Sequence, residues 1–285
     1  MAALVIRLLS QLLAEPRLRG VDVNSPGLLD LQRRILAEKP MMRGVLEDFY
    51  RACMTRDDRW FAGAGRRVEI GAGASLFKAM SPDIISTDIK PSPGLDMVVD
   101  AQRMPFPDGS LRAVFGINCF HHIPSPDAFF RELVRVLGTG GGCVLIEPHS
   151  GPVARVMYRR LFATETFDTT QPGWDAPPGT GVMTGANQAL SFLVFVRDRA
   201  RFESAYPELE ILELRVLTNW PRYLLSGGLN FRSLAPAIAT PLVRIAEWLM
   251  APLAPWLGLH RVIVLRRRAT GRPGGPTAST PAPAR

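Results

Sequence analysis

The stretch VEIGAGASLF, from Val68 to Phe77, decides how the surrounding chain is expected to fold. Its apolar beginning is typical of the end of a buried strand, and Gly71 and Gly73 permit a tight turn that a residue with a Cβ would resist. A helix is expected to begin at Ser75. A strand, a glycine turn and a helix N-terminus leave backbone N–H groups free to bind phosphate or other polar groups of a ligand. The stretch therefore predicts a nucleotide-binding turn, without saying which nucleotide it binds.

From this turn onward the chain alternates predicted strands and helices. A helix that is capped by Ser125-Pro126 and stopped at Gly138 separates the fourth strand from the fifth. Strands joined by helical crossovers predict an α/β fold with a doubly wound, mainly parallel sheet. The strand candidates are Val68–Ile70, Ile84–Asp88, Met97–Val99, Ala113–Ile117, Cys143–Glu147, Leu209–Leu217 and His260–Arg268.

Composition divides the chain into three parts. Apolar residues at helical spacing, with Ser25-Pro26 as a predicted helix start, make residues 1–60 an N-terminal helical cap. Residues 61–268 are expected to form the α/β domain, whose inserts at 148–208 and 218–259 either cap the substrate or face a membrane. Residues 269–285 lack apolar groups to bury and are predicted to be a disordered tail.

Composition also narrows the class of protein. A chain of 285 residues with 47% apolar residues can build one large α/β domain with additions. The three cysteines have no CxxC spacing and the four histidines have no metal spacing with carboxylates, so we expect a reducing compartment and no metal site. The net charge of +8 is compatible with nucleic acid or anionic lipid, but the arginines are scattered along the chain. Charge alone therefore does not identify a partner.

The first helix resembles a targeting signal only in part. Its apolar residues, from Leu4 to Leu13, repeat at helical spacing, but Arg7 interrupts the run and no small-residue cleavage site follows. Nowhere in the sequence does an uninterrupted, strongly apolar run reach the ~18 residues that a membrane span needs. An amphipathic helix packed on the body is favoured over an exported precursor. The protein is expected in the cytoplasm, either free or held peripherally on the inner face of the membrane.

Polar residues at successive strand ends discriminate between the possible nucleotides. A dinucleotide fingerprint would need glycine where the chain has Leu76. Asp88 ends the second strand, where a carboxylate can accept both ribose hydroxyls, and Asp100-Ala101 follow the third strand, where an adenine edge is expected. Asn118 ends the fourth strand. Each residue alone is more often a turn or cap residue than a ligand, but their order along one edge of the sheet favours a nucleoside cofactor.

Together, the segments VEIGAGASLF, ISTDI and VVDAQRMPFPDGSLRAVFGINCFHHIPSPDAFFRELVRVLGTGGGCVLIEP resemble the class I S-adenosylmethionine-dependent methyltransferases, and most of all their type 11 group of quinone and other small-molecule methyltransferases. The resemblance covers Val68 to Pro148. It implies a seven-stranded Rossmann-like sheet whose last strand is antiparallel, with S-adenosyl-L-methionine as cofactor. The helix after the glycine turn departs from the family because Ser81-Pro82 keeps it brief.

The resemblance also implies a set of cofactor-binding residues. They are Glu69, Gly71, Ala72 and Gly73 on the methionine side, Asp88 at the ribose, Ile89, Asp100 and Ala101 at the adenine, and Asn118 near the sulfonium.

Methyl transfer to a hydroxyl or to an acidic carbon also needs a base. His149, just past the fifth strand, is the first candidate and His121 the second, although a loop histidine that only hydrogen-bonds the backbone is the common alternative for either. Nucleic-acid N-methyltransferases carry Asn/Asp-Pro-Pro-aromatic after the fourth strand, whereas this chain continues from Asn118 as Cys119-Phe120-His121. Nucleic acid is therefore not an expected partner.

The predicted function is the transfer of a methyl group to a small-molecule or lipid-linked acceptor, with O- or C-methylation favoured. A non-catalytic S-adenosylmethionine-binding regulatory or partner module remains the alternative, and a nicotinamide oxidoreductase would need the glycine that Leu76 replaces. The sequence does not set the oligomeric state.

Residues 218–259 carry the best clue to the acceptor. The segment is rich in Trp, Leu and Pro, is broken by Arg244 and Glu247, and leads into a strand that finishes on three arginines. Such a segment fits a membrane interface, with aromatic rings at headgroup level and arginines on anionic lipid. A cap packed on the sheet or a dimer surface fits equally well. If the segment lies on lipid, the acceptor would be a lipid, a quinone or a polyprenyl-linked sugar.

Overall fold

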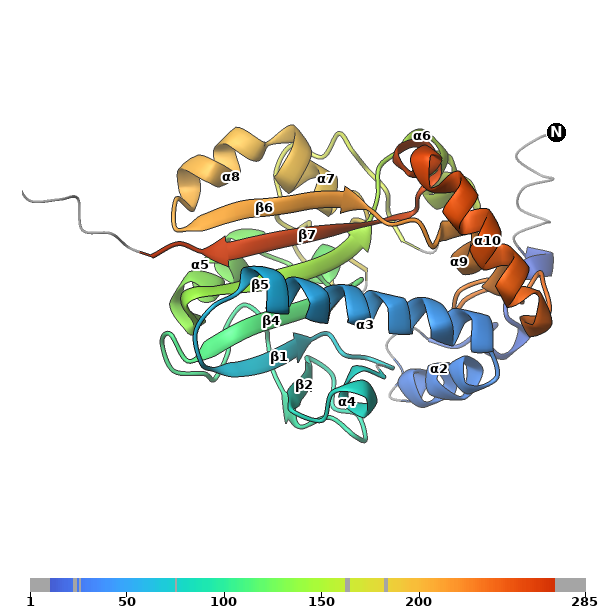
Figure 1. Ribbon diagram of the computed structural model, residues 1–285, viewed down its shortest axis with the longest axis horizontal. Coiled ribbons are helices and arrows are strands. Elements are labelled where there is room, and N and C mark those ends of the chain that lie inside the picture. The colour runs from blue at the N-terminus through green and yellow to red at the C-terminus, as the bar shows by residue number, and fades with distance from the viewer. Residues whose placement is uncertain are drawn as a thin grey trace, which may run out of the picture.

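The computed structural model describes residues 11–22, 25, 27–74, 76–161, 165–181 and 184–269. A seven-stranded sheet with the order β3-β2-β1-β4-β5-β7-β6 runs through the molecule, and helices cover both of its faces (Figure 1). The strands are β1 (Arg66–Ile70), β2 (Ile84–Asp88), β3 (Met97–Val98), β4 (Leu111–Ile117), β5 (Leu137–Pro148), β6 (Leu209–Val216) and β7 (His260–Arg267). Neighbouring strands from β3 to β5 pair in parallel, and β7 is antiparallel to both of its neighbours. The predicted fold class is thereby confirmed.

The helices before β5 include the longest one in the described chain. Two α-helices precede β1 in the described part of the chain, as predicted, and the brief helix α4 after the glycine turn is also confirmed. These helices are α2 (Leu28–Ala37), α3 (Pro40–Trp60), α4 (Phe77–Met80) and α5 (Pro126–Val136). The helices after β5 are α6 (Pro152–Val156), α7 (Leu190–Phe192), α8 (Arg199–Ala205), α9 (Trp220–Ser226), α10 (Thr240–Met250) and α11 (Ala254–Leu257).

The sheet separates two apolar cores because successive side chains of a strand point to opposite faces. In β4, Val114 packs with the aromatic residues of α5, whereas Phe115 packs with Val45, Phe49 and their neighbours on α3. Figure 1 shows α3 lying across one face of the sheet, with α5 on the other. Burial on both faces explains why the central strands read as continuous apolar runs. The strands thereby hold their carboxyl ends in a fixed row at one edge.

Two predicted helix starts have different outcomes. Ser125 is the N-cap of α5 and Pro126 its first residue, as predicted. The start at Ser25 is wrong, because α2 begins at Leu28 with Gly27 at its N-cap and no side-chain cap. The expectations for residues 1–10, for a helix starting at Ser75 itself and for the tail beyond residue 269 lie outside the described residues.

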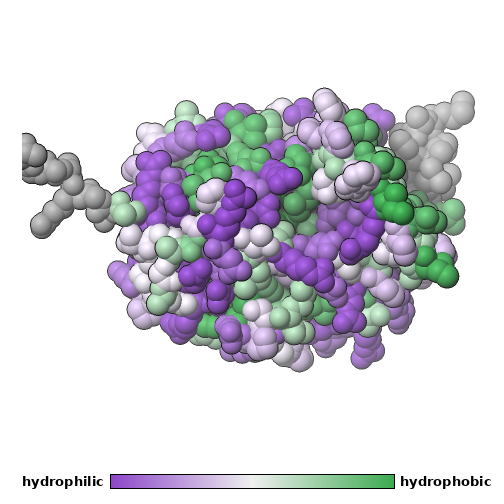
Figure 2. Space-filling model, viewed as in Figure 1, coloured by the Kyte–Doolittle hydropathy of each residue, from purple (hydrophilic) through white to green (hydrophobic). Residues whose placement is uncertain are grey.

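The helix α10 and its neighbours form the part of the described chain with the most exposed apolar surface. Ala237–Leu257 is one stretch that is long and apolar enough to cross a membrane by length and composition, and 17% of its apolar 18-residue window is buried. One side of α10 faces the body through Glu247, whose carboxylate accepts hydrogen bonds from the backbone N–H and the Nε of the buried Arg222, at 3.1 and 2.7 Å. Figure 2 shows the apolar surface gathered over this end of the molecule. The charge that interrupts the apolar sequence at Glu247 thus holds α10 to α9.

Candidate functional site

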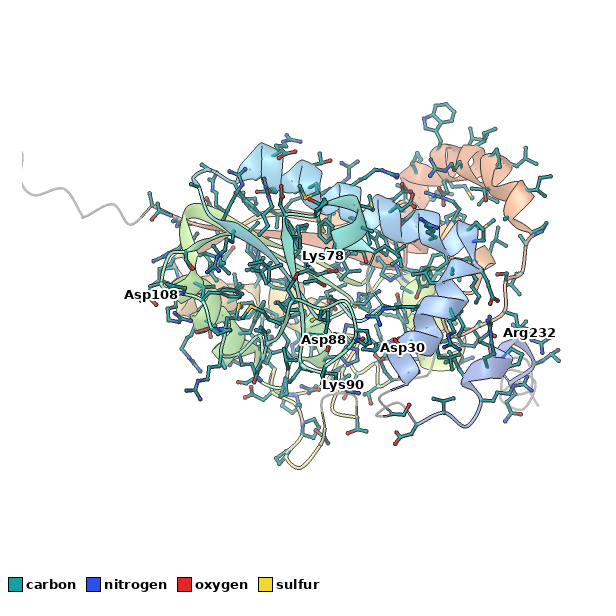
Figure 3. The ribbon with its side chains drawn as sticks, turned by 90° about the horizontal axis from the view of Figure 1, so that it is seen from below. Asp30, Lys78, Asp88, Lys90, Asp108 and Arg232 are labelled. Carbon is teal, nitrogen blue, oxygen red and sulfur yellow. The ribbon has the colours of Figure 1, made fainter. Side chains whose placement is uncertain are left out.

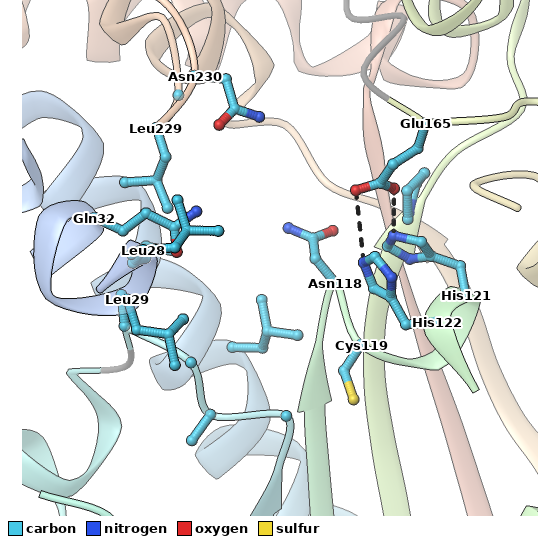
Figure 4. Close-up of a pocket in the computed structure, with 18 of the residues that line it drawn as sticks. Leu28, Leu29, Gln32, Asn118, Cys119, His121, His122, Glu165, Leu229 and Asn230 are labelled. Atoms are coloured by element: carbon cyan, nitrogen blue, oxygen red, sulfur yellow. Dashed lines mark hydrogen bonds and ion pairs between the residues drawn. The ribbon is translucent and has the colours of Figure 1, made fainter. Parts of the chain in front are cut away.

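A cavity of about 350 Å³ lies at the carboxyl ends of β1, β2, β4 and β5. This is the edge at which parallel α/β sheets bind their ligands, and the volume is within the range of roughly 300–1,000 Å³ for small-molecule sites. Figure 4 shows Leu28, Leu29 and Gln32 of α2 on one wall, with Leu229 and Asn230 beside them and the histidines and Glu165 opposite. The cavity therefore has two halves, which we call the donor half, around the glycine turn, and the acceptor half, around the histidines.

The glycine turn has a backbone that a side chain would disrupt. Gly71 and Gly73 have φ angles of +60° and +51°, in the left-handed region. A Cβ on Gly71 would lie 2.3 Å from Cys119 Sγ, so that the turn and the end of β4 approach too closely for any other residue. Glu69, Ala72 and both glycines line the cavity, as predicted.

Asp88 ties the end of β2 to this turn. Its Oδ2 accepts a hydrogen bond from the Gly73 N–H at 2.8 Å, and its Oδ1 accepts one from the Lys90 N–H at 2.9 Å. A carboxylate has about four acceptor positions, so two remain for hydroxyl groups in the cavity. Figure 3 shows Asp88 and Lys90 close together on the same side of the molecule. Asp88 and its neighbour Ile89 both line the cavity.

Asn118 has the one left-handed non-glycine backbone among the described residues, with φ +49°. Such strain is found preferentially at functional sites. Its Oδ1 is buried and has no hydrogen-bond partner within the described part of the chain. Figure 4 shows its side chain pointing into the cavity between the two halves. An acceptor oxygen without a partner here fits a ligand that brings a donor or a positive charge.

The acceptor half is built around buried ionic groups. His121 Nδ1 lies 2.5 Å from Glu147 Oε2, and its Nε2 lies 3.1 Å from Glu165 Oε2. Burial disfavours a charge on His121, but Glu147 and Glu165 outweigh this and raise its pKa to about 10. His121 therefore lies in the cavity, as predicted, but as a cation between two carboxylates. The prediction that His121 serves as a general base is wrong for this protonated form, because a general base must be unprotonated.

His149 is not in the cavity, and the prediction of a base at this position is wrong. Its Nε2 lies 3.1 Å from the Pro255 carbonyl oxygen, and its Nδ1 lies 2.7 Å from a terminal guanidinium nitrogen of Arg261. Burial, together with the charge of Arg261, lowers the pKa of His149 to about 4. Both ring nitrogens are thus used to join β5 to β7 and α11. The alternative of a histidine that hydrogen-bonds within the protein is the correct one.

Asp100 and Ala101 are not among the residues that line the cavity, and their predicted contact with an adenine edge stays a prediction. They lie outside the lining because β3 has only two residues and lies at the edge of the sheet. The chain then turns at once, and Asp100 Oδ1 accepts the N–H of Gln102 at 2.9 Å. Asp100 is a turn residue, and Ala101 packs against the core below the sheet edge.

Several lining residues carry no recognisable sequence signal. Glu165 and Gln188 belong to the long insert after β5, and Leu229 and Asn230 follow α9. His122 was part of the motif that suggested the family, but Glu165, which lies beside it in space, is 43 residues further along the chain. Only the fold brings these residues together.

Parts of this chain are similar to known methyltransferases. Residues 70–145 match a family described as a methyltransferase domain. A segment of 49 residues is 39% identical to ajmaline N-methyltransferase of Rauvolfia serpentina and spans 17% of each chain. The geranyl diphosphate C-methyltransferase of Streptomyces coelicolor A3(2) is 16% identical, with a TM-score of 0.44 over 78% of this chain and 77% of that one. The putative methyltransferase of Haloferax volcanii, solved with the activator Trm112, is 13% identical, with a TM-score of 0.45 over 84% and 98%.

Residues 70–145 are therefore similar to a methyltransferase domain, and they lie in a seven-stranded sheet of the Rossmann-like type.

Proposed function

We propose that this protein transfers a methyl group from S-adenosylmethionine to a small-molecule or lipid-linked acceptor. The observation that carries the proposal is the donor half, in which Gly73 and Asp88 are bound to each other and Asn118 presents an unpartnered oxygen at the same strand edge. This arrangement fits a nucleoside with two hydroxyl groups and a positively charged sulfur.

S-adenosylmethionine supplies an activated methyl group when it is bound. In the proposed reaction the acceptor's lone pair forms a bond to the methyl carbon, the carbon–sulfur bond breaks, and its electrons remain on sulfur. A hydroxyl acceptor releases its proton to water. The chain's own contribution is to align the two reactants and exclude water, and positioning alone can supply ~7–11 kcal/mol.

An apolar acceptor, such as a lipid, a quinone or a polyprenyl-linked sugar, is supported by the surface beside the cavity. The loop that follows α9 contributes Gly227 to Phe231 to the cavity lining, and α10 packs on α9. The outer side of α10 and its neighbours exposes large apolar side chains, several of them more than half exposed. They are Ile238, Leu242, Ile245, Trp248, Leu249, Leu253 and Trp256.

We propose that this surface, the α10 face, contacts an anionic membrane from the cytoplasmic side. Two exposed tryptophans fit the interfacial region of a bilayer, and Arg244 on the same helix is more than half exposed. Because Glu247 holds the opposite side of α10 to the body, the helix fits a peripheral rather than a spanning position. An acceptor dissolved in the bilayer would then enter the cavity past the loop after α9.

The alternative is a module that binds S-adenosylmethionine without turning it over. The absence of a histidine base at 149 favours this alternative, whereas the acidic acceptor half favours catalysis. An enzyme and a non-catalytic module would both use the donor half. Measuring methyl transfer therefore distinguishes them, whereas measuring cofactor binding does not.

The test is calorimetric titration of S-adenosylmethionine, and separately of NAD, into wild type, Asp88→Ala and Asp108→Asn in the presence of EDTA. Asp108 is a matched control because its carboxylate is exposed and pairs with Arg135 away from the cavity. We expect micromolar binding of S-adenosylmethionine that weakens at least ~30-fold in Asp88→Ala, since charge-assisted hydrogen bonds to two hydroxyls are lost. Transfer of labelled methyl to an organic-soluble extract then tests catalysis. Binding of NAD alone, or of neither nucleotide, would overturn the proposal.

A further inference from the structure

We propose that His121, His122 and Glu165 bind a divalent transition-metal ion in the acceptor half of the cavity. The candidate ligand atoms of the three side chains all lie within 4.8 Å of one another. His121 Nε2 is 3.1 Å from one carboxylate oxygen of Glu165, and His122 Nε2 is 3.6 Å from the other. In a tetrahedral site with metal–ligand distances of about 2.0–2.1 Å, the ligand atoms lie ~3.3 Å apart. The two distances from the histidines to Glu165 are close to this spacing.

Glu147 orients His121 as a ligand-supporting carboxylate would. Its Oε1 accepts the backbone N–H groups of Cys119 and Phe120, at 2.9 and 2.8 Å, which fixes the fully buried carboxylate. Its Oε2 then binds His121 Nδ1, so that Nε2 is the nitrogen that faces Glu165. A metal-binding histidine typically donates its second N–H to a carboxylate in this way, which sets the tautomer and the ring direction.

The surroundings of Glu165 also favour a bound ion over an ion pair alone. Gln188 Nε2 donates a hydrogen bond to Glu165 Oε2 at 3.3 Å and so holds the carboxylate in place. Figure 4 shows this carboxylate facing the rings of both His121 and His122. Gln188 Oε1 is a buried acceptor without a partner among the described residues. Water or a hydroxyl group bound to a metal ion is a hydrogen-bond donor of the kind that this oxygen lacks.

The ligand types narrow the choice of ion. Two imidazoles and one carboxylate suit Zn²⁺, Fe²⁺, Co²⁺ or Mn²⁺, whereas Mg²⁺ and Ca²⁺ prefer oxygen ligands throughout. Three protein ligands leave an open position, as in catalytic rather than structural zinc sites. This position faces the cavity, which fits an acceptor with an ionisable hydroxyl or enol oxygen. The ion would lower the pKa of that oxygen and so take over the task that His149 cannot perform; this role rests on the proposed function, but metal binding does not.

The test is metal binding by the untagged full-length protein, after it has been stripped with EDTA and without S-adenosylmethionine. ZnCl₂ and MgCl₂ are titrated into wild type, His122→Ala and Glu165→Gln, and visible absorption is recorded with CoCl₂. Glu203→Gln is the matched control for the carboxylate, because Glu203 forms an exposed ion pair with Arg199. His149→Gln is the control for the loss of a histidine outside the cavity.

We expect one equivalent of Zn²⁺ to bind to wild type and both controls, with no comparable binding of Mg²⁺. Binding is expected to weaken at least ~10-fold in each cluster variant, with loss of the Co²⁺ absorption bands. Circular dichroism establishes that each variant is folded, and His122→Asn replaces any His122→Ala that is not. No stoichiometric Zn²⁺ binding, or binding that is equal in the cluster variants and the controls, would overturn the metal site. Because S-adenosylmethionine binding is measured separately in EDTA, either proposal can fail without the other.

Discussion

The donor and acceptor halves of the cavity are built in different ways. Apart from Asn118 at the end of β4, the donor half consists of backbone conformations and strand ends that lie within 18 residues of Gly71, with Asp88 bound back onto Gly73. The acceptor half consists of charged side chains drawn from β5, from the segment after β4 and from the long insert. A site made of backbone depends on shape, whereas a site made of buried charges depends on protonation. The two halves should therefore respond to different perturbations.

A change of pH is expected to have the largest effect, because the stability of the protein depends on the protonation of its buried histidines. On the acid side, burial holds the pKa of His149 at about 4, whereas the unfolded chain has the usual value near 6.5. Between these values the unfolded state binds a proton that the folded state does not, so stability falls as pH falls from 6.5 towards 4. The loss amounts to about 3 kcal/mol for His149. The buried His260, with a pKa lowered to about 3, adds to it in the same direction.

Above pH 7, the pH dependence of the stability of the EDTA-treated protein is expected to come mainly from the acceptor half. Glu147 and Glu165 outweigh the effect of burial and raise the pKa of His121 to about 10, so its contribution is full below pH 6.5 and is lost as pH rises from 6.5 towards 10. Urea unfolding at pH 5, 7 and 9 should therefore give highest stability near pH 7. His149→Gln should flatten the acid limb only, and Glu165→Gln the alkaline limb. A flat profile, or one limb that responds to both variants, would contradict the assignment.

A side chain at Gly71 is expected to break the donor half alone. In Gly71→Ala the new Cβ meets Cys119 Sγ at 2.3 Å, and the backbone has φ +60°. Gly109→Ala is the matched control, because its φ is +65° but its Cβ would meet nothing within 4 Å. Both variants carry the strain of about 1–2 kcal/mol for a left-handed residue, and Gly71→Ala adds roughly 1–3 kcal/mol from the clash.

Calorimetry and urea unfolding measure the two consequences at Gly71. S-adenosylmethionine binding should weaken at least ~10-fold in Gly71→Ala and stay unchanged in Gly109→Ala, while Zn²⁺ binding survives in both. Equal behaviour of the two variants would mean that the close approach to Cys119 does not shape the site.

This difference between the halves also explains which features the sequence could predict. The seven strands and the glycine turn were predictable because each depends on a short local pattern, such as the apolar run before Gly71. Asp88 could be placed by the same logic, since it directly ends a strand. The resemblance to a known family added the antiparallel last strand, which the pairing of β5 with β7 confirms.

The failures have a common physical cause. His149 comes after a strand end, as expected, but its environment is set by Arg261 and Pro255, which lie 112 and 106 residues away in sequence. The expectation of no metal site used histidine spacing alone and stays a prediction, but spacing could not show that Glu165 reaches His121 and His122 from the long insert. Asp100 lies outside the cavity lining because β3 is short, and the length of an edge strand is not a local property. Positions that depend on long-range packing cannot be assigned from spacing alone.

A substitution on the α10 face is expected to have the smallest effect. It tests whether this surface, which lies outside the cavity, contacts a membrane. Trp248 is 76% exposed, so Trp248→Ser should leave stability within about 0.5 kcal/mol of wild type. Transfer of an indole ring into a bilayer interface contributes on the order of 1–2 kcal/mol, so binding to anionic phosphatidylglycerol vesicles should weaken ~5- to 30-fold in flotation assays. Val98→Ser, on β3 and 57% exposed, is the control that should bind as wild type does. Donor binding should be the same in all three proteins, because no residue of α10 lines the cavity. Equal flotation of Trp248→Ser and wild type would contradict the membrane contact, and a concentration-dependent dimer that Trp248→Ser dissociates would assign the α10 face to a second copy of the chain instead.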